Sequence, residues 1–168
     1  MLSFLFLKKL NFQIDEQSCY DEIANKGRAV WFTAKNNPDG SLEFVKDKEG
    51  CQFYLGRLSK FPVTLSEVKK YIPDVNIENS YVTKCFPGYS MIPHKDANRS
   101  TAIIMPLGDN KGKIDFFLFG KKVHTHIYTG PTLTRVDVDH SAVNASDSIR
   151  YSVTVEVPNS YLKNYFKR

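Results

Sequence analysis

A mainly β fold with flanking helices is predicted by three features of the sequence. From Ser80 onward, short runs of β-branched and aromatic residues recur about every ten residues, separated by Gly, Pro and Asn turns. Two segments with helix-start signals precede these runs. No repeat or Pro/Gly/Ser-rich linker divides the chain, and its 168 residues suit a single domain with a sizeable core.

The N-terminal part, residues 1–79, is predicted to support the fold with helices and strands. Asp15 is a suitable N-cap for a helix that runs to Asn25, with Gly27 as its stop. Thr64 and Glu67 have the spacing of a capping box, which predicts a second helix that ends before Pro73. Strands are predicted at Ala29–Thr33, Leu42–Val45 and Cys51–Leu55.

Residues 80–157 are predicted to form a β core, followed by a tail at 158–168 that is a surface helix or a frayed end. The expected strands are Tyr81–Phe86, Ser90–His94, Thr101–Leu107, Ile114–Leu118, Val123–Tyr128, Thr134–Val138 and Arg150–Val157. One more strand from the N-terminal third would complete the eight strands of a double-stranded β-helix, a jelly roll of the cupin-like kind.

Composition excludes several classes of protein. A net charge of +5 from scattered lysines is too small and too dispersed for a nucleic-acid surface, so nucleic acid is an unlikely partner. Three distant cysteines without a Cys-x-x-Cys pair indicate reduced thiols in a cytoplasmic protein. The apolar run at Met1–Leu7 is too short for a signal peptide or a membrane span, and no membrane association is expected.

The chemistry of the chain is concentrated in two histidines, an aspartate and an arginine. His94 and Asp96 are two residues apart, so on an extended strand both side chains point to the same face. His140, at the end of the strand expected at 134–139, could complete a facial triad that leaves three coordination positions open, as a non-haem Fe(II) oxygenase requires.

An arginine follows the second histidine at a spacing that suggests a second function. Arg150 opens a strand that has a half-buried pattern, and a guanidinium inside a pocket needs an anion, because an unpaired buried charge is strongly unfavourable. Its forked donors match a carboxylate. Ser152 lies on the same face and could donate a second hydrogen bond.

In this combination the chain resembles the Fe(II)- and 2-oxoglutarate-dependent dioxygenases, nearest to the prolyl-hydroxylase-like branch. The resemblance covers about half of the chain, from Tyr81 to Val157. It rests on Cys85-Phe86-Pro87-Gly88, His94-x-Asp96, Arg99 before a strand, His140, and Arg150-Tyr151-Ser152-Val153-Thr154-Val155.

The resemblance implies that His94, Asp96 and His140 hold Fe(II), and that Arg150 with Ser152 binds the distal carboxylate of the cosubstrate 2-oxoglutarate. With O2, and with ascorbate as a helpful reductant, such an enzyme hydroxylates an unactivated C–H bond. Two features depart from the family. Phe86 stands where the branch often has tyrosine, so that hydroxyl contact is either missing or supplied from elsewhere, with Tyr81 and Tyr89 as the candidates. The second arginine of nucleic-acid demethylases is absent, and Glu156 lies near its place.

Several other residues have competing interpretations. Arg99 is either a contact to the cosubstrate or, preferred here, an ion pair at the rim. His124 and His126 repeat the spacing of a metal pair but lack a carboxylate, so partly exposed strand histidines are expected, with His126 a candidate for the pocket. The run Phe116–Phe119 is assigned to the core, and Asn144 to stabilising a turn.

Three functions remain open from the sequence. The first is hydroxylation of a protein or peptide side chain, plausibly a proline. The second is the same chemistry on a small metabolite or free amino acid. The third is a cupin-like binding module without turnover, which would be favoured by His and Cys ligands that fill every coordination position of the metal. The sequence leaves the oligomeric state undetermined.

Overall fold

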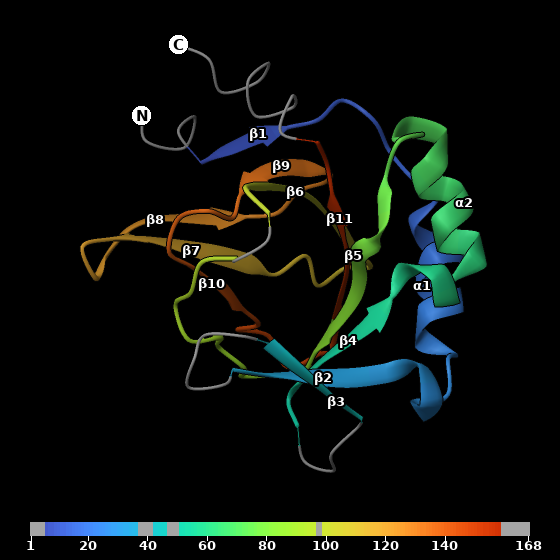
Figure 1. The fold of residues 1–168 in the computed structure, drawn as a ribbon, viewed down its shortest axis with the longest axis horizontal. Helices are drawn as coiled ribbons and strands as arrows, with labels where there is room; N and C mark the ends of the chain where they lie inside the picture. Colours follow the sequence, from blue (N-terminus) through green and yellow to red (C-terminus); the bar gives the residue numbers. More distant parts are fainter. Residues whose placement is uncertain (1–5, 37–41, 47–50, 97–98, 159–168) are drawn as a thin grey trace.

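The fold is known from a computed structural model that describes residues 6–36, 42–46, 51–96 and 99–158. The expected tail lies outside the described residues from position 159 onward. The described residues form two helices and two antiparallel sheets (Figure 1). As predicted, the protein is mainly β with flanking helices.

The larger sheet contains eight strands in the order β1-β9-β6-β11-β5-β4-β2-β3. In that order the strands are Leu7–Lys9, Thr132–Arg135, Thr101–Leu107, Arg150–Glu156, Asn76–Cys85, Phe53–Arg57, Trp31–Asn36 and Leu42–Lys46. The central strands β6 and β11 are buried almost throughout. Both faces of this part of the sheet are therefore covered, and the half-buried pattern expected for the strand at Arg150 is wrong.

The smaller sheet has the order β10-β7-β8, formed by His140–Val143, Lys113–Leu118 and Lys121–Ile127. The segment before His94 adds to its edge, because single bridges pair Ser90 with Val143 and His94 with His140. Along the chain, four strands of the large sheet (β5, β6, β9 and β11) alternate with these four segments, except that β7 and β8 follow one another as a hairpin within the small sheet. This alternation is the double-stranded β-helix that the sequence predicts.

The eighth strand of the β-helix lies in a different place from the prediction. It is β10, beginning at His140, and does not come from the N-terminal third of the chain. The preceding strand β9 ends at Arg135, so His140 starts a strand instead of ending one. A four-residue strand that follows directly on a turn has too few residues for its alternation to stand out from its surroundings.

The two helices cover one face of the large sheet (Figure 1). Helix α1, Glu16–Ala24, begins at the predicted N-cap Asp15, whose carboxylate accepts a hydrogen bond from Ser18 N at 3.1 Å. The capping box predicted for helix α2, Pro62–Tyr71, is wrong, because Thr64 lies inside the first turn. Glu22 of α1 performs the capping, accepting hydrogen bonds from Val63 N, Thr64 N and Thr64 Oγ1 at 2.8–3.1 Å.

Two apolar clusters divide the interior. The larger one lies between the helices and the outer face of the large sheet, where Ile23 and Val68 meet Val153 and Val155. The smaller one lies inside the β-helix and includes Phe6, Ile114, Phe116 and Tyr128. No helix among the described residues is long and apolar enough to cross a lipid bilayer.

Candidate metal and diacid site

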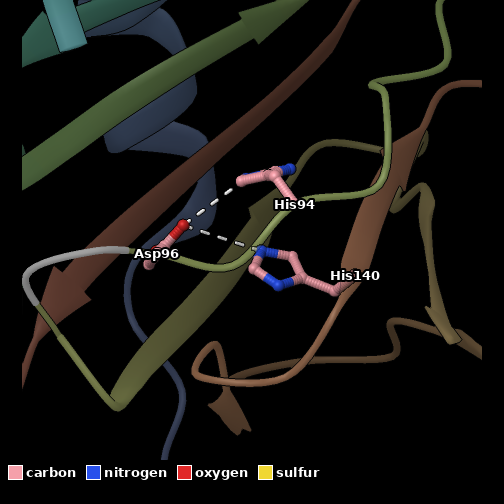
Figure 2. Close-up of side chains that lie close together, drawn as sticks. All are labelled: His94, Asp96 and His140. Carbon is pink, nitrogen blue, oxygen red and sulfur yellow. Dashed lines mark ion pairs between the residues drawn. The ribbon is translucent and has the colours of Figure 1, made fainter. Parts of the chain in front are cut away.

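The structure brings His94, Asp96 and His140 together at one point (Figure 2). One ligand atom from each residue lies within 4.8 Å of the other two. Asp96 Oδ1 is 3.4 Å from His94 Nε2 and 3.8 Å from His140 Nε2. Among the described residues this is the one such group of three or more potential ligands, so its ligand set is three side chains.

Backbone pairing explains why residues 46 positions apart in sequence meet. His94 N donates to His140 O at 3.0 Å, and His140 N donates to His94 O at 2.9 Å, which fixes the two imidazoles side by side. The chain then turns, and Asp96 N donates to Val136 O at 2.8 Å. These three backbone hydrogen bonds position all three side chains before any metal binds.

Both imidazoles are oriented with the same nitrogen toward the centre of the group. His94 Nδ1 is 3.0 Å from Ile92 O, and His140 Nδ1 is 2.9 Å from Val138 O. A backbone carbonyl can only accept, so each Nδ1 carries a proton and donates. The Nε2 atoms are therefore the ones available to a metal, in the arrangement typical of ligating histidines.

The protonation states of Asp96 and His140 suit metal binding. Burial opposes ionisation of Asp96, but the hydrogen bond with His94 and the charge of Arg99 outweigh it and hold the pKa of this carboxyl well below its usual range. Burial lowers the pKa of His140, which favours the neutral imidazole that a metal requires. Burial also lowers the pKa of His94, but the hydrogen bonds to Asp96 and Ile92 O more than compensate, and the net shift is upward.

Arg150 lies inside the β-helix because of the alternation along β11. Tyr151, Val153 and Val155 belong to the apolar cluster beneath the helices, so Arg150 and Ser152 face the opposite way, toward the small sheet. The side chain is almost completely buried, with 4% of the residue surface exposed. The inner face of β11 therefore places buried polar side chains beside the apolar cluster inside the β-helix.

The guanidinium of Arg150 has no anionic partner among the described residues. Its Nε atom is buried without a hydrogen-bond acceptor, and none of the ion pairs includes it. Burial lowers the pKa of Arg150, yet arginine remains protonated at neutral pH. A buried, unpaired cation is costly, and a carboxylate ligand would remove that cost.

Tyr128 is a second polar group beside Arg150 that the sequence analysis missed. The guanidinium carbon of Arg150 lies 5.6 Å from the centre of the Tyr128 ring. The Tyr128 hydroxyl is buried without a hydrogen-bond partner among the described residues, and burial raises the pKa of this phenol to about 12. Tyr128 is therefore a neutral O–H donor next to a cation. Its spacing of two from His126 could have indicated a shared face.

Gly112 makes room for the arginine, which leads to the first prediction. A Cβ atom at this position would lie 2.3 Å from Arg150 Cδ and Nε, and the backbone φ is +67°. We expect Gly112→Ala to displace the guanidinium and to weaken by about tenfold or more the binding of 2-oxoglutarate that the sequence resemblance implies, since charge-assisted hydrogen bonds depend strongly on geometry. Isothermal titration calorimetry under anaerobic conditions measures this effect.

Gly88→Ala is the matched control for Gly112→Ala. Gly88 has a φ of +76°, so alanine is strained there too, but its Cβ would meet no heavy atom within 4 Å. Both variants are expected to lose stability by about 1 kcal/mol from the left-handed backbone, whereas only Gly112→Ala should change diacid affinity. Equal diacid affinity in the two variants would contradict the role of Gly112 in making room for the Arg150 side chain.

The remaining predicted site residues lie in several places. Ser152 already has a hydroxyl partner, since its Oγ is 2.5 Å from Thr83 Oγ1. Tyr81 lies on β5 opposite Thr154, and the Tyr89 ring stacks on Phe53 with centroids 5.6 Å apart. A contact of either tyrosine hydroxyl with the cosubstrate stays a prediction.

The histidine pair of β8 faces the β-helix interior. In the small sheet, Phe116 of β7 pairs with His140 on one side and with His124 on the other, and Ile114 of β7 pairs with His126. Directly paired residues share a face of the sheet, so His124 and His126 lie on the same inner face as His140. Their Nε2 atoms are buried without partners among the described residues. Neither belongs to a group of three or more potential ligands in the described chain.

Asn144 stabilises the turn that joins the second histidine to the arginine, as predicted from sequence. The side chain is completely buried, and its Nδ2 donates to Cys85 O and Ser148 O at 2.9 Å. Its Oδ1 accepts from Ser146 N and from Asn110 Nδ2. This network fixes the approach of the chain to β11, and therefore the starting point of Arg150.

Comparison with solved structures identifies the same fold in oxygenases. The chain is similar to a 2OG-Fe(II) oxygenase family oxidoreductase from Burkholderia pseudomallei, with 12% identity, a TM-score of 0.52, and coverage of 65% of this chain and 69% of that chain. It is also similar to a prolyl hydroxylase from Trichoplax adhaerens solved with a peptide fragment of hypoxia inducible factor. There the identity is 11% and the TM-score 0.57, with 91% and 82% covered.

A third solved structure, E. coli ycfD, has 14% identity and a TM-score of 0.56, and the match covers 92% of this chain and 50% of that one. No protein-family model and no curated protein sequence matches the chain. The structural likenesses show that the chain has the double-stranded β-helix of the 2OG-Fe(II) oxygenases, a prolyl hydroxylase among them. This agrees with the resemblance found in the sequence.

Proposed function

We propose that the protein is a non-haem Fe(II)- and 2-oxoglutarate-dependent dioxygenase that hydroxylates an unactivated C–H bond. The observation that carries this proposal is the buried, unpaired Arg150 beside Tyr128, inside the β-helix whose edge carries the three-ligand group. The ligand types fit Fe(II), and the guanidinium with the phenol fits one carboxylate of an organic diacid.

The residues of the chain have distinct tasks in this reaction. Bound Fe(II), together with 2-oxoglutarate, supplies the chemistry that reduces dioxygen, inserts one oxygen atom into the substrate and yields succinate and carbon dioxide. His94, Asp96 and His140 hold the metal through three ligand atoms and leave the other positions open. Arg150 orients the diacid, and the closed apolar interior around Phe116 and Ile114 excludes water from it.

The organisation of the chain follows from these roles. We assign residues 80–157 to the catalytic core, residues 1–79 to its support and 158–168 to a tail. Cys19, Cys51 and Cys85 are unpaired, which supports a reducing compartment such as the cytoplasm. The dispersed positive charge makes nucleic acid a poor candidate substrate.

Turnover without any added substrate tests the reaction class. The pure protein, incubated with Fe(II), 2-oxoglutarate, ascorbate and air, is expected to form succinate slowly, because many oxygenases consume the cosubstrate in an uncoupled reaction. Succinate is quantified by mass spectrometry against samples that lack iron or oxygen. A protein that binds neither Fe(II) nor 2-oxoglutarate, and forms no succinate, would refute the proposal.

A protein or peptide side chain is the substrate class that we favour, and the β7–β8 hairpin supports it. Phe119 at the tip is fully exposed, and it has a positive φ of 52°, followed by Gly120 at 73°. Asn-Gly is the usual pair in such a turn, so a bulky phenylalanine there is unfavourable for stability. The core position expected for Phe119 is therefore wrong, as is that of Leu118, 39% exposed.

The position of the hairpin agrees with a role in binding a large substrate. Phe116 pairs with His140, and the strand continues toward the tip, so Phe119 lies about 10 Å beyond the level of the histidine. Figure 1 shows the hairpin projecting from the body of the protein. A small metabolite or free amino acid, the alternative substrate class, would not reach this tip.

Phe119→Asn tests the role of the hairpin. We expect the free energy of unfolding to rise slightly, because asparagine tolerates this backbone, while kcat/KM for a peptide substrate falls about tenfold through loss of one aromatic contact. Substrates are found by incubating a defined peptide library and detecting the gain of one oxygen atom. Val63→Ser, on α2, is the control for removing an exposed apolar side chain. An unchanged kcat/KM would show that Phe119 does not contact the peptide, and a library in which no peptide gains an oxygen atom would favour small substrates.

A further inference from the structure

The two carboxylate oxygens of Asp96 have different partners. Oδ1 lies nearest the ligating nitrogens, 3.4 Å from His94 Nε2 and 3.8 Å from His140 Nε2. Oδ2 accepts a hydrogen bond of 2.6 Å from Arg99 Nε, which is also an ion pair. The carboxylate is thereby divided into one oxygen that faces the histidines and one that is occupied by the protein.

Arg99 is itself held in place. A second guanidinium nitrogen donates to Asn79 O of β5 at 3.3 Å, which ties the arginine to the large sheet. The side chains of Arg99 and Asp96 are 19% and 16% exposed, so the pair is largely shielded from water. A shielded, charge-assisted hydrogen bond is stronger than a surface ion pair and restrains the rotation of the carboxylate.

A second arginine–aspartate pair provides a contrast. Arg135 donates to both oxygens of Asp137, with Nε to Oδ1 at 2.9 Å and an Nη atom to Oδ2 at 2.8 Å. That pair is more exposed, with each side chain at 32%, and its aspartate is not part of the three-ligand group. Arg135 therefore occupies both carboxylate oxygens of Asp137, whereas Arg99 occupies only Oδ2 of Asp96 and does not bind its Oδ1.

We propose that Arg99 is a positioning residue that restricts Asp96 to binding the metal through Oδ1 alone. A carboxylate can bind a metal through one oxygen or two, and the second oxygen occupies a further coordination position. With Oδ2 held by Arg99, that position stays open for the diacid or for oxygen. The inference rests on the metal site of the proposed function, and it extends the ion pair that was the preferred expectation for Arg99.

Cobalt(II) is a suitable probe, because its visible absorption spectrum reports the coordination number and needs no catalytic turnover. Wild-type protein, Arg99→Gln and Arg99→Lys are each titrated with Co(II) under anaerobic conditions, and then with 2-oxoglutarate. In Arg99→Gln we expect an altered Co(II) spectrum before any diacid is added, and an affinity for 2-oxoglutarate about tenfold weaker than wild type. Arg99→Lys, which retains one cationic donor, should lie between the two.

Arg135→Gln is the matched control, since it removes the same charge from an ion pair whose aspartate is not one of the three candidate metal ligands. It should keep the wild-type spectrum and diacid affinity. An Arg99→Gln protein with the wild-type spectrum would overturn the inference whatever its Co(II) affinity, as would a change of equal size in Arg135→Gln. Absence of Co(II) binding by the wild type would instead refute the metal site, so the two failures are distinguishable.

Discussion

Arg150→Met is expected to abolish productive binding of 2-oxoglutarate while leaving the protein folded. Loss of a buried, charge-paired arginine at an interface costs about 2–5 kcal/mol, so the dissociation constant should rise at least about 30-fold. Metal binding should persist, because Arg150 is not among the three ligands. Calorimetric titration of the Mn(II)-loaded protein, without oxygen, measures the diacid affinity directly.

The same substitution should have an unusual effect on stability. Arg150 has 4% of its residue surface exposed, and its Nε has no hydrogen-bond partner in the described chain. Replacing an unpaired buried charge by an apolar side chain of similar length removes a desolvation cost. We therefore expect the free energy of unfolding in urea to rise by about 1–3 kcal/mol. Saturating diacid should raise the free energy of unfolding of the wild-type protein, and so remove part of its difference from Arg150→Met.

Arg150→Lys and Arg135→Met complete the experiment. Lysine keeps the charge but lacks the fork of donors, so diacid binding should be intermediate. Arg135→Met removes an arginine that pairs with Asp137 and should change neither diacid affinity nor metal binding. If Arg150→Met bound 2-oxoglutarate with the wild-type dissociation constant, the assignment of the diacid site would be wrong.

Asp96→Ala is expected to have the largest effect on the metal. Asp96 supplies the single negative charge in a group whose other members are two imidazoles, so its removal should weaken Fe(II) or Co(II) binding by at least about 100-fold and reduce succinate formation to background. Asp96→Asn retains the shape and an oxygen that can accept from Arg99, and it should lose the metal while preserving the local structure.

A histidine outside the triad provides the control for these metal titrations. His124 lies on the same inner face as His140 but is not in the three-ligand group. His124→Ala should bind Co(II) with the wild-type affinity, although it loses packing against Phe116. Retained metal binding in Asp96→Ala, or a comparable loss in His124→Ala, would point to a different metal site.

Much of the fold was predictable because it depends on local patterns. The strand at Thr101–Leu107 has the predicted bounds, and the helix after Asp15 begins where its capping residue indicates. The errors have a common cause. The capping of α2 by Glu22 depends on a residue about 40 positions away, and β10 is recognisable mainly through its pairing with β7.

The candidate site shows the same division between local and distant information. The spacing of His94 and Asp96 indicated a shared face, and the identity of Arg150 indicated an anion. No local pattern indicated that Tyr128 and Gly112 lie beside the guanidinium. An ion pair was the preferred interpretation of Arg99, but the sequence did not identify Asp96, three residues away, as its partner. The exposure of Phe119 also contradicted its apolar character, because burial depends on what other segments cover.

The sequence by itself determined the residue types of the site, the faces on which they lie within each strand, and a mainly β architecture. Side-chain alternation is a property of each strand, so it can be read without knowing the partners. The tertiary structure alone decided which strands pair, and with them the bridge that joins His94 to His140. It also decided that Arg150 is buried without an anionic side chain beside it among the described residues, because burial and pairing depend on residues that are distant in sequence.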